Sequence, residues 1–286
     1  MPVATIAALF VYPVKGCRGI AVSRARVGAR GLVAESPGGE AGDREWMVVD
    51  RDGRFVTQRE HPRLALVETG LLPGTLVLAS AGMPPLPVPL AAPAPTPARD
   101  VVVWNSGVRA HDAGESAARW ISELVGAQLR LVRFDPAHRR LCNPDYAGTS
   151  GAHIAFADGY PVLVIGEASL ADVNDRLAAN GSTAVPMNRF RPNVVLAGLE
   201  PYDEDHLDTI TAVGVTLRPV KPCIRCSVTT TDQDSAKVGT EPLATLAGYR
   251  TNAALAGVAF GMNAIVVEGE GRELTVGAGA DCRFAF

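Results

Sequence analysis

The sequence predicts an α+β, β-rich fold in which a few helices lie on barrels or sheets. Short runs rich in Val, Leu and aromatic residues, broken by turn residues, dominate the first hundred positions, whereas only three segments carry helix signals. The chain has 286 residues, which exceeds the size at which a single hydrophobic core usually stops growing. Two domains are therefore expected.

Strands are predicted in the first hundred residues wherever apolar residues cluster between turn residues. The expected strands are ATIAALFVYPV (4–14), WMVVD (46–50), RFVTQ (54–58), LALVE (64–68) and TLVLAS (75–80). Asp52-Gly53 predicts a tight turn between WMVVD and RFVTQ, because glycine accepts positive φ. The proline-rich stretch 83–100 is either a surface loop or a domain boundary. Strand character resumes over 101–112, around an Asn-Ser-Gly turn.

Three helices are predicted, over ESAARWISELVGAQ (115–128), EASLADVNDRLAANG (167–181) and EPLATLAGYR (241–250). In the first, Ala118, Ile121 and Val125 fall on one face. In the second, Ser169 and Asp172 have the spacing of a capping box. The remaining expected strands are LRLVRF (129–134), YPVLVIG (160–166), RPNVVLAG (191–198) and TLRPVKP (216–222), and AIVVEGEGRELTVG (264–277) predicts a closing hairpin.

Composition limits the partners and the cellular compartment that can be expected for the protein. A formal net charge of −3 gives no reason to expect a nucleic-acid partner. The five cysteines form an odd, sparse set that suits a reducing compartment rather than a disulfide framework. The N-terminus lacks the basic region of a signal peptide, and no run approaches the roughly 20 apolar residues of a membrane span. We therefore expect a soluble, cytoplasmic protein with no membrane partner.

The segment VKPCIRCSVTT (220–230) raises the main chemical question. Cys223 and Cys226 have no second ligand pair, which argues against a structural zinc site. A β-branched sequence follows them, where a redox pair would need the start of a helix. Two buried, inert thiols are the simplest alternative. The pair by itself leaves these alternatives open.

The wider context resembles a known family. Six blocks carry the resemblance, namely YPVKGCRG (12–19), DREWMVVD (43–50), FADGYPVLVIGEASLADVN (156–174), FRPNVVLAG (190–198), VKPCIRCSVTT and EPLATLAGYR. They occur in the order found in MOSC-domain proteins, specifically the two-domain group that contains the bacterial YcbX type and the mitochondrial amidoxime-reducing component. The resemblance implies an N-terminal MOSC β-barrel-like domain (1–125), of which about 1–50 also packs on the second domain, and a MOSC β-barrel with peripheral helices (126–286).

The resemblance also implies a molybdenum cofactor, a pterin that carries molybdenum on a dithiolene and ends in a phosphate. The metal ligand of the family aligns with Cys226, and a soft thiolate suits that metal. Arg225 beside it favours the thiolate, whereas Cys223 aligns with a cysteine that is not the ligand. The residues implied to hold the cofactor are Lys15, Gly16, Arg44, Gly159, Tyr160, Arg191, Asn193, Ile224 and Arg225.

Asp158 in the FADGYP block is either a proton handler or an anchor near the metal, since removal of oxygen from nitrogen consumes protons. Its plain alternative is a turn aspartate before glycine. Two positions depart from the family pattern, because Gly16 and Ile224 stand where Ser is frequent. A side-chain hydroxyl is thus missing at the first position, and the second makes the pocket rim more apolar.

The function implied is that of a molybdenum-cofactor oxidoreductase that reduces N-hydroxylated compounds. No four-cysteine cluster motif follows the second domain, so we expect a separate flavin or iron–sulfur protein to donate electrons to a monomeric enzyme. The alternative is a carrier that transfers sulfur as a Cys226 persulfide, or delivers cofactor, without turning over a substrate.

Overall fold

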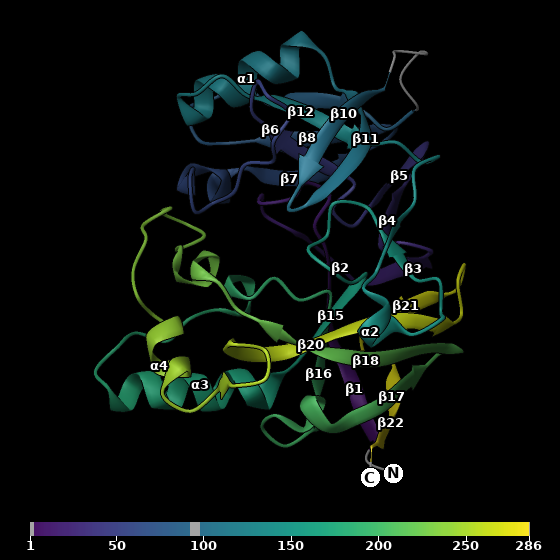
Figure 1. Cartoon of the computed structure of the whole chain (residues 1–286), viewed down its shortest axis with the longest axis vertical. Coiled ribbons are helices and arrows are strands. Elements are labelled where there is room, and N and C mark those ends of the chain that lie inside the picture. Colours follow the sequence, from purple (N-terminus) through teal and green to yellow (C-terminus); the bar gives the residue numbers. More distant parts are fainter. Residues whose placement is uncertain (1–2, 92–97, 286) are drawn as a thin grey trace.

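Seven strands close into a barrel in the computed structural model, which describes residues 3–91 and 98–285 (Figure 1). The closure occurs because β15 pairs both with β16, in parallel, and with β20, antiparallel. Around the ring the order is β15 (Val162–Gly166), β16 (Val194–Ala197), β1 (Val3–Val11), β22 (Gly279–Phe284), β17 (Leu207–Ala212), β18 (Val215–Ile224) and β20 (Gly257–Glu268). Two short strands, β2 (Ile20–Val22) and β19 (Thr251–Asn252), pair at its margins.

The first strand of the chain is one of the seven strands of this barrel. β1 pairs antiparallel with β16 on one side and with β22 on the other. Ile6, Leu9 and Val11 of β1 are at most 1% exposed and belong to the core that fills the barrel. The barrel core therefore depends on residues that are far apart in the sequence.

The other lobe, at the top of Figure 1, is built from two small sheets and a helix. One sheet has the order β10 (Arg99–Val103), β11 (Ser106–Asp112), β12 (Arg130–Phe134) and β6 (Trp46–Val49); the other contains β7 (Glu68–Leu72), β8 (Thr75–Ala79) and β9 (Leu86–Pro89). Helix α1 (Glu115–Val125) buries Trp120, Ile121 and Leu124 against them.

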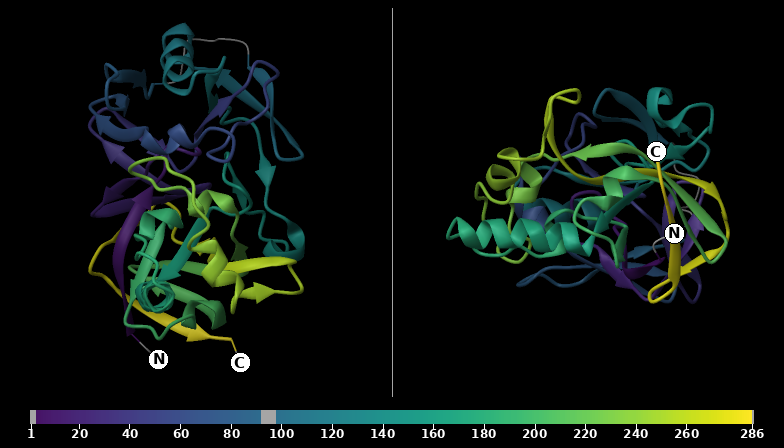
Figure 2. Two further views of the ribbon diagram at one scale, coloured as in Figure 1. Left: turned by 90° about the vertical axis from the view of Figure 1, so that its left-hand side faces the viewer. Right: turned by 90° about the horizontal axis from the view of Figure 1, so that it is seen from below.

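A third sheet ties the two lobes together. It contains β3 (Arg24–Gly28), β4 (Gly31–Ser36) and β5 (Gly39–Gly42), and β21 (Glu273–Thr275) from the far end of the chain pairs with β3. Figure 2 shows the two lobes stacked along the long axis. Helices α3 (Glu167–Ala179) and α4 (Leu243–Ala247) lie together on the outside of the barrel. The remaining short elements are β13 (Arg140–Leu141), α2 (Pro144–Ala147), β14 (His153–Ile154) and the 3-10 turns η1 (Pro62–Leu66), η2 (Met187–Arg189), η3 (Asp203–His206) and η4 (Ser227–Thr230).

The predicted α+β, β-rich class is confirmed, and each of the three predicted helices is present. Two predicted strands are wrong. Residues 54–58 form only isolated bridges, through Arg54 and Phe55. Most of LALVE is the turn η1, which Pro62 initiates.

Three further local predictions are wrong. Instead of forming a hairpin with β20, β21 pairs with β3. Ser169 does not cap α3; its hydroxyl donates to the buried Glu204 carboxylate, and Gly166 occupies the N-cap position. The proline-rich stretch, predicted as a surface loop or a domain boundary, is in part the strand β9; its residues 92–97 lie outside the described part of the chain.

None of the helices in the described part of the chain is long and apolar enough to cross a membrane.

Candidate functional site

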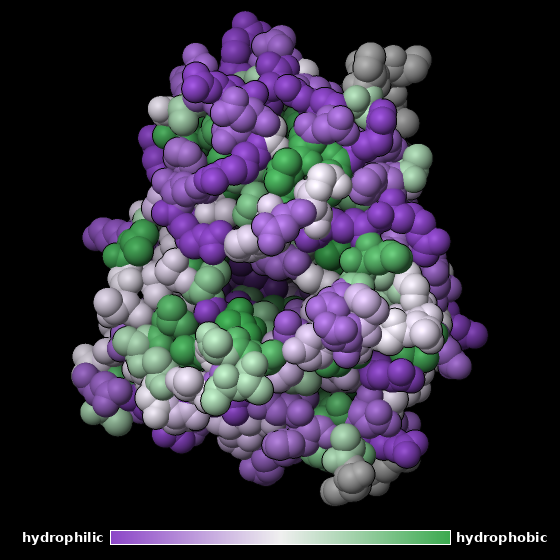
Figure 3. Space-filling view, in the orientation of Figure 1, coloured by the Kyte–Doolittle hydropathy of each residue, from purple (hydrophilic) through white to green (hydrophobic). Residues whose placement is uncertain are grey.

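A pocket opens between the two lobes, and the predicted cofactor residues line it. Its lining includes Cys226, Asp158 and the whole predicted cofactor set, namely Lys15, Gly16, Arg44, Gly159, Tyr160, Arg191, Asn193, Ile224 and Arg225. They come from five segments: the β1–β2 and β5–β6 connections, the loop before β15, the approach to β16, and the end of β18. The hollow at the middle of Figure 3 lies between the lobes.

Two arginines of the pocket stack on one ring. The guanidinium carbons of Arg44 and Arg191 each lie 4.4 Å from the ring centroid of the buried Tyr12. Arg44 has φ of 50° and Arg191 φ of 58°, in the left-handed region that residues other than glycine rarely adopt. Strained backbone of this kind clusters at functional sites, where surrounding contacts hold it. The stacking on Tyr12 is such a contact.

Arg191 is a buried cation with an unpaired hydrogen-bond donor. Its Nη1 donates to the Cys17 carbonyl at 2.6 Å, but its buried Nη2 has no hydrogen-bond partner among the described residues. Burial and the neighbouring Arg44 lower the pKa of Arg191 to about 10, so it remains a cation at neutral pH. An unpaired guanidinium N–H on an arginine that lines a pocket suits an anionic group such as phosphate.

Arg44 is held in place by a buried polar network. Its Nη1 donates to Asp43 Oδ2 at 2.6 Å and to Asn193 Oδ1 at 3.3 Å. The Asn193 amide also donates to Asp43 Oδ1 at 2.8 Å and to the Phe10 carbonyl, and it accepts from the Leu163 backbone N–H at 3.0 Å. The Asn193 side chain is therefore committed to protein contacts, and its visible effect is to orient Arg44.

Lys15 and Asp158 form an ion pair at the pocket wall. Lys15 Nζ lies 2.5 Å from Asp158 Oδ1 and donates to the Phe156 carbonyl at 2.9 Å. Desolvation alone would raise the pKa of Asp158, but Lys15 and the Trp104 indole N–H, which donates to Oδ1 at 2.8 Å, hold it well below its usual range. Asp158 therefore stays ionised at neutral pH.

The loop that carries Asp158 is fixed from behind by Arg140. The Arg140 guanidinium donates to the carbonyls of Ala155, Ala157 and Asp158 at 3.2, 2.5 and 3.4 Å. Burial lowers the pKa of Arg140, and Asp158 opposes the shift. A basic residue within a polar, basic loop gives no sequence signal for this internal role.

The two neighbouring cysteines lie in different environments. Cys226 is exposed, whereas Cys223 is partly buried and packs on the apolar cluster around α3 and α4. Arg225 donates from Nη1 to Cys223 Sγ at 2.9 Å and from Nη2 to the Phe190 carbonyl at 2.6 Å. Both cysteines line the pocket, and Cys226 is the more exposed of the two.

The other lobe contributes a wall of the pocket whose residues were not predicted from the sequence. Phe55, Val56, Thr57, Gln58, Arg59 and Trp104 line it. Most belong to the segment that was predicted to be a strand, in which side chains would alternate between faces. Because the segment forms only isolated bridges, at Arg54 and Phe55, it lacks the regular alternation of a strand, and consecutive side chains reach the pocket. The polar run Thr57-Gln58-Arg59 after a tight turn was the available signal.

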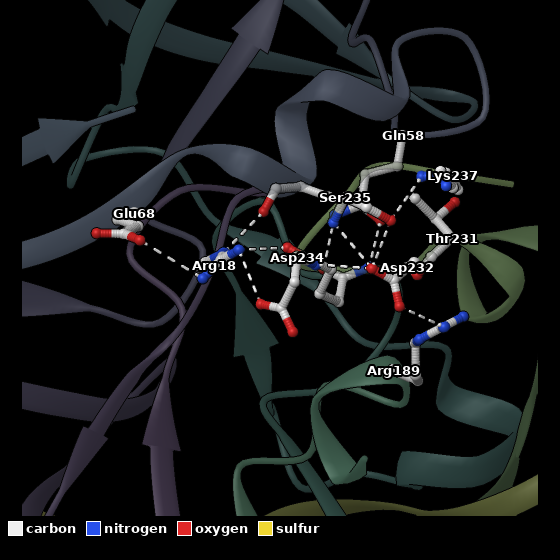
Figure 4. Close-up of polar contacts among 11 residues, drawn as sticks. Arg18, Gln58, Glu68, Arg189, Thr231, Asp232, Asp234, Ser235 and Lys237 are labelled. Atoms are coloured by element: carbon white, nitrogen blue, oxygen red, sulfur yellow. Dashed lines mark hydrogen bonds and ion pairs between the residues drawn. The ribbon is translucent and has the colours of Figure 1, made fainter. Parts of the chain in front are cut away.

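A buried amide pair joins that wall to the segment after Cys226, and Figure 4 labels Gln58 of the wall together with Asp232 and Asp234 of that segment. Gln58 Nε2 donates to Gln233 Oε1 at 3.1 Å, and Gln233 Nε2 donates to Gln58 Oε1 at 3.0 Å. Gln58 also donates to the Gly16 carbonyl at 2.7 Å. Arg18 reaches the same segment, with Nη2 2.6 Å from the Gln233 carbonyl and 2.9 Å from Asp234 Oδ1. Three pocket segments thus meet at Gln58.

Comparison with known proteins gives two matches to family models. The model for the MOSC N-terminal beta barrel domain matches residues 3–128, and the model for the MOSC domain matches residues 151–282. The chain belongs to the two-domain MOSC family that includes the amidoxime-reducing components. This MOSC protein is 37% identical over 253 residues to human mitochondrial amidoxime-reducing component 1, covering 87% of this chain and 72% of that one.

Other amidoxime-reducing components match this chain to a similar extent. Rat mitochondrial amidoxime reducing component 2 is 34% identical and the human component 2 is 32% identical, each over 87% of this chain and 73% of the relative. The relatives are named mitochondrial, which contradicts the expected cytoplasmic location. Sparse cysteines and the lack of a signal-peptide pattern are equally compatible with other reducing compartments, so the inference from composition was too narrow.

Proposed function

We propose that this MOSC protein is a molybdenum-cofactor-dependent reductase of N-hydroxylated compounds. The observation that carries the proposal is one pocket in which the exposed thiol of Cys226 faces a cationic wall, with an unpartnered N–H on the buried Arg191. The names and domains of the relatives support the same reading.

The residues present fit the cofactor. Among the described residues, no three His, Cys, Asp or Glu side chains gather as metal ligands. A metal at Cys226 therefore needs its other ligands from a non-protein group, and a dithiolene would supply them. Lys15, Arg44 and Arg191 would hold its anionic parts by charge and by directed N–H groups.

When bound, the cofactor supplies the two-electron chemistry that removes oxygen from nitrogen. Cys226 would ligate the metal through its thiolate. Tyr12, whose pKa burial raises to about 12, stays neutral and keeps the two arginines stacked on its ring. Asp158 would remain a hydrogen-bond acceptor beside the substrate, because the pKa of its carboxyl group is low. Electrons would come from a separate donor protein.

Metal and activity assays on matched cysteine variants test this function. We expect about one molybdenum per chain, pterin fluorescence, and reduction of benzamidoxime with an artificial electron donor. Cys226→Ser should lose the activity, whereas Cys223→Ser, three positions earlier in the chain, should keep most of it. Sulfane sulfur without molybdenum would point to the sulfur carrier instead. Loss of activity in the Cys223 variant but not in the Cys226 variant would refute the ligand assignment.

A further inference from the structure

Charge is distributed unevenly over the pocket. Among its described lining residues, five are cations, namely Lys15, Arg44, Arg59, Arg191 and Arg225, and one is a carboxylate, Asp158. Anionic parts of a cofactor would engage cations. The surrounding cations favour the ionised form of this carboxylate, which makes Asp158 the one anionic hydrogen-bond acceptor among these lining residues.

The Asp158 carboxylate has one occupied oxygen and one free oxygen. Lys15 Nζ and Trp104 Nε1 both donate to Oδ1, at 2.5 and 2.8 Å. No donor in the described part of the chain lies within hydrogen-bonding distance of Oδ2. The side chain of Asp158 is 73% exposed in the pocket. Two donors on one oxygen fix the orientation of the carboxylate and leave Oδ2 available to a ligand.

Trp104 is unusual among the aromatic residues of the chain. It lies in the tight turn between β10 and β11 with φ of 54°, and it is 43% exposed. Its ring centroid lies 4.9 Å from that of Phe55, and the Arg59 guanidinium carbon lies 5.0 Å from it. Core packing does not account for a strained, exposed tryptophan, whereas the hydrogen bond to Asp158 gives its indole a defined use.

On the basis of the reductase function proposed above, we propose that Asp158 and Trp104 form a subsite for the planar N–H-bearing head group of the substrate. Oδ2 of Asp158 accepts a hydrogen bond from the amino group that an amidoxime carries on its carbon. Trp104 is a positioning residue, because it acts on the substrate through the carboxylate that it orients. The two lobes thus contribute one part each to substrate selection.

This arrangement discriminates between substrates in a defined way. An amidoxime has an amino group where an aldoxime has only a hydrogen atom on the same carbon. A compound without that donor leaves Oδ2 of Asp158 without a partner from the substrate, and sites built to hydrogen-bond a substrate reject analogues that lack the group. The subsite therefore predicts a preference for amidoximes over aldoximes with the same ring.

The kinetic test compares benzamidoxime with benzaldoxime on one enzyme preparation. The readout is the ratio of the two kcat/KM values, which does not depend on how much enzyme is loaded with cofactor. Asp158→Asn should lower this ratio by about 10- to 100-fold, the range expected for a hydrogen bond to a charged group. Trp104→Phe keeps an aromatic ring but removes the donor, and it should lower the ratio in the same direction by a smaller factor.

Trp120→Phe is the matched control for Trp104→Phe. Trp120 lies on α1, and its Nε1 donates to the Pro84 carbonyl at 2.7 Å. It is not among the described residues that line the pocket. The control should leave the ratio unchanged. Equal losses on both substrates in the Asp158 and Trp104 variants would overturn the subsite.

Calorimetry with benzamide separates this proposal from the reductase proposal, because benzamide is neutral and carries an amino group on carbon but has no N–O bond to reduce. We expect wild-type protein to bind benzamide, and Asp158→Asn to bind it at least about tenfold more weakly. Binding without any reduction of benzamidoxime would retain the subsite and refute the reductase. Absence of benzamide binding to the wild-type protein would refute the subsite, whatever the reductase assay shows.

Discussion

Single residues of the pocket carry charges that only their neighbours make tolerable. Lys15 is buried at the pocket wall, which lowers the pKa of its ammonium group, while Asp158 opposes that shift. Arg44 and Arg191 combine burial, like charge and positive φ, and both rest on Tyr12. A free energy cost of this kind persists only where the surrounding structure fixes it, which is typical of a ligand site.

The Lys15–Asp158 pair predicts an acid-dependent loss of stability. The pKa of Asp158 is lower in the folded protein than the value of about 3.9 in an unfolded chain. Ionised Asp158 therefore stabilises the fold at neutral pH, and its contribution declines as pH falls below about 3.9. Urea unfolding should show Asp158→Asn less stable than wild type at pH 7, with a smaller difference at pH 3.

Asp52→Asn, at a 79% exposed carboxylate, is the control and should show little difference at either pH. A difference for Asp158→Asn that is the same at both pH values would contradict the assignment.

Elements that form through local signals could be predicted from the sequence. Helices α1 and α3 follow from apolar periodicity, and the β10–β11 hairpin follows from two apolar runs around a turn. Residues 54–58 and β21 could not be assigned correctly, because their partners are distant in the sequence. Arg54 bridges to Val102, and Glu273 pairs with Arg26. Tertiary partners decide such segments, and propensity does not.

The segment around Gln58 yields a prediction at the level of elements. Gln58 and Gln233 are 1% and 3% exposed, and each satisfies the other across the two lobes. Replacing either one by Ala leaves the amide oxygen of the other buried and unpaired, and should cost about 1–3 kcal/mol of unfolding free energy. The double variant should cost less than the sum of the two single variants, because the second change leaves no further amide unpaired. Chemical denaturation measures this cycle, with Gln128→Ala as an exposed control expected within about 0.5 kcal/mol of wild type. Additive single costs would show that the pair is not coupled.

At the scale of the whole molecule, the site exists because the chain crosses between lobes several times. The six blocks that carry the family resemblance supplied the residues of the cationic wall and the thiol, and they supplied them from positions 12–250. The lobe that contributes Gln58, Arg59 and Trp104 was not anticipated at the pocket, since only the way the lobes pack together brings it there. Sequence motifs thus identified the inner part of the pocket, and three-dimensional packing defined its mouth.

The barrel should not close without the first strand of the chain. Ile6, Leu9 and Val11 of β1 are fully buried. Burial of each such side chain stabilises a fold by roughly 1.5–3 kcal/mol. Their loss therefore removes an amount comparable with the unfolding free energy of a whole protein, which is roughly 5–15 kcal/mol. A fragment of residues 136–286 also leaves the edges of β16 and β22 unpaired, and we expect it to be unfolded by circular dichroism and to aggregate. Fusing residues 1–42 behind it through a short Gly-Ser linker should restore the fold, because β1 and β22 are antiparallel neighbours with Val3 opposite Asp281. A cooperative thermal transition in the fragment 136–286 without the fused residues 1–42 would show that β1 is dispensable for the barrel.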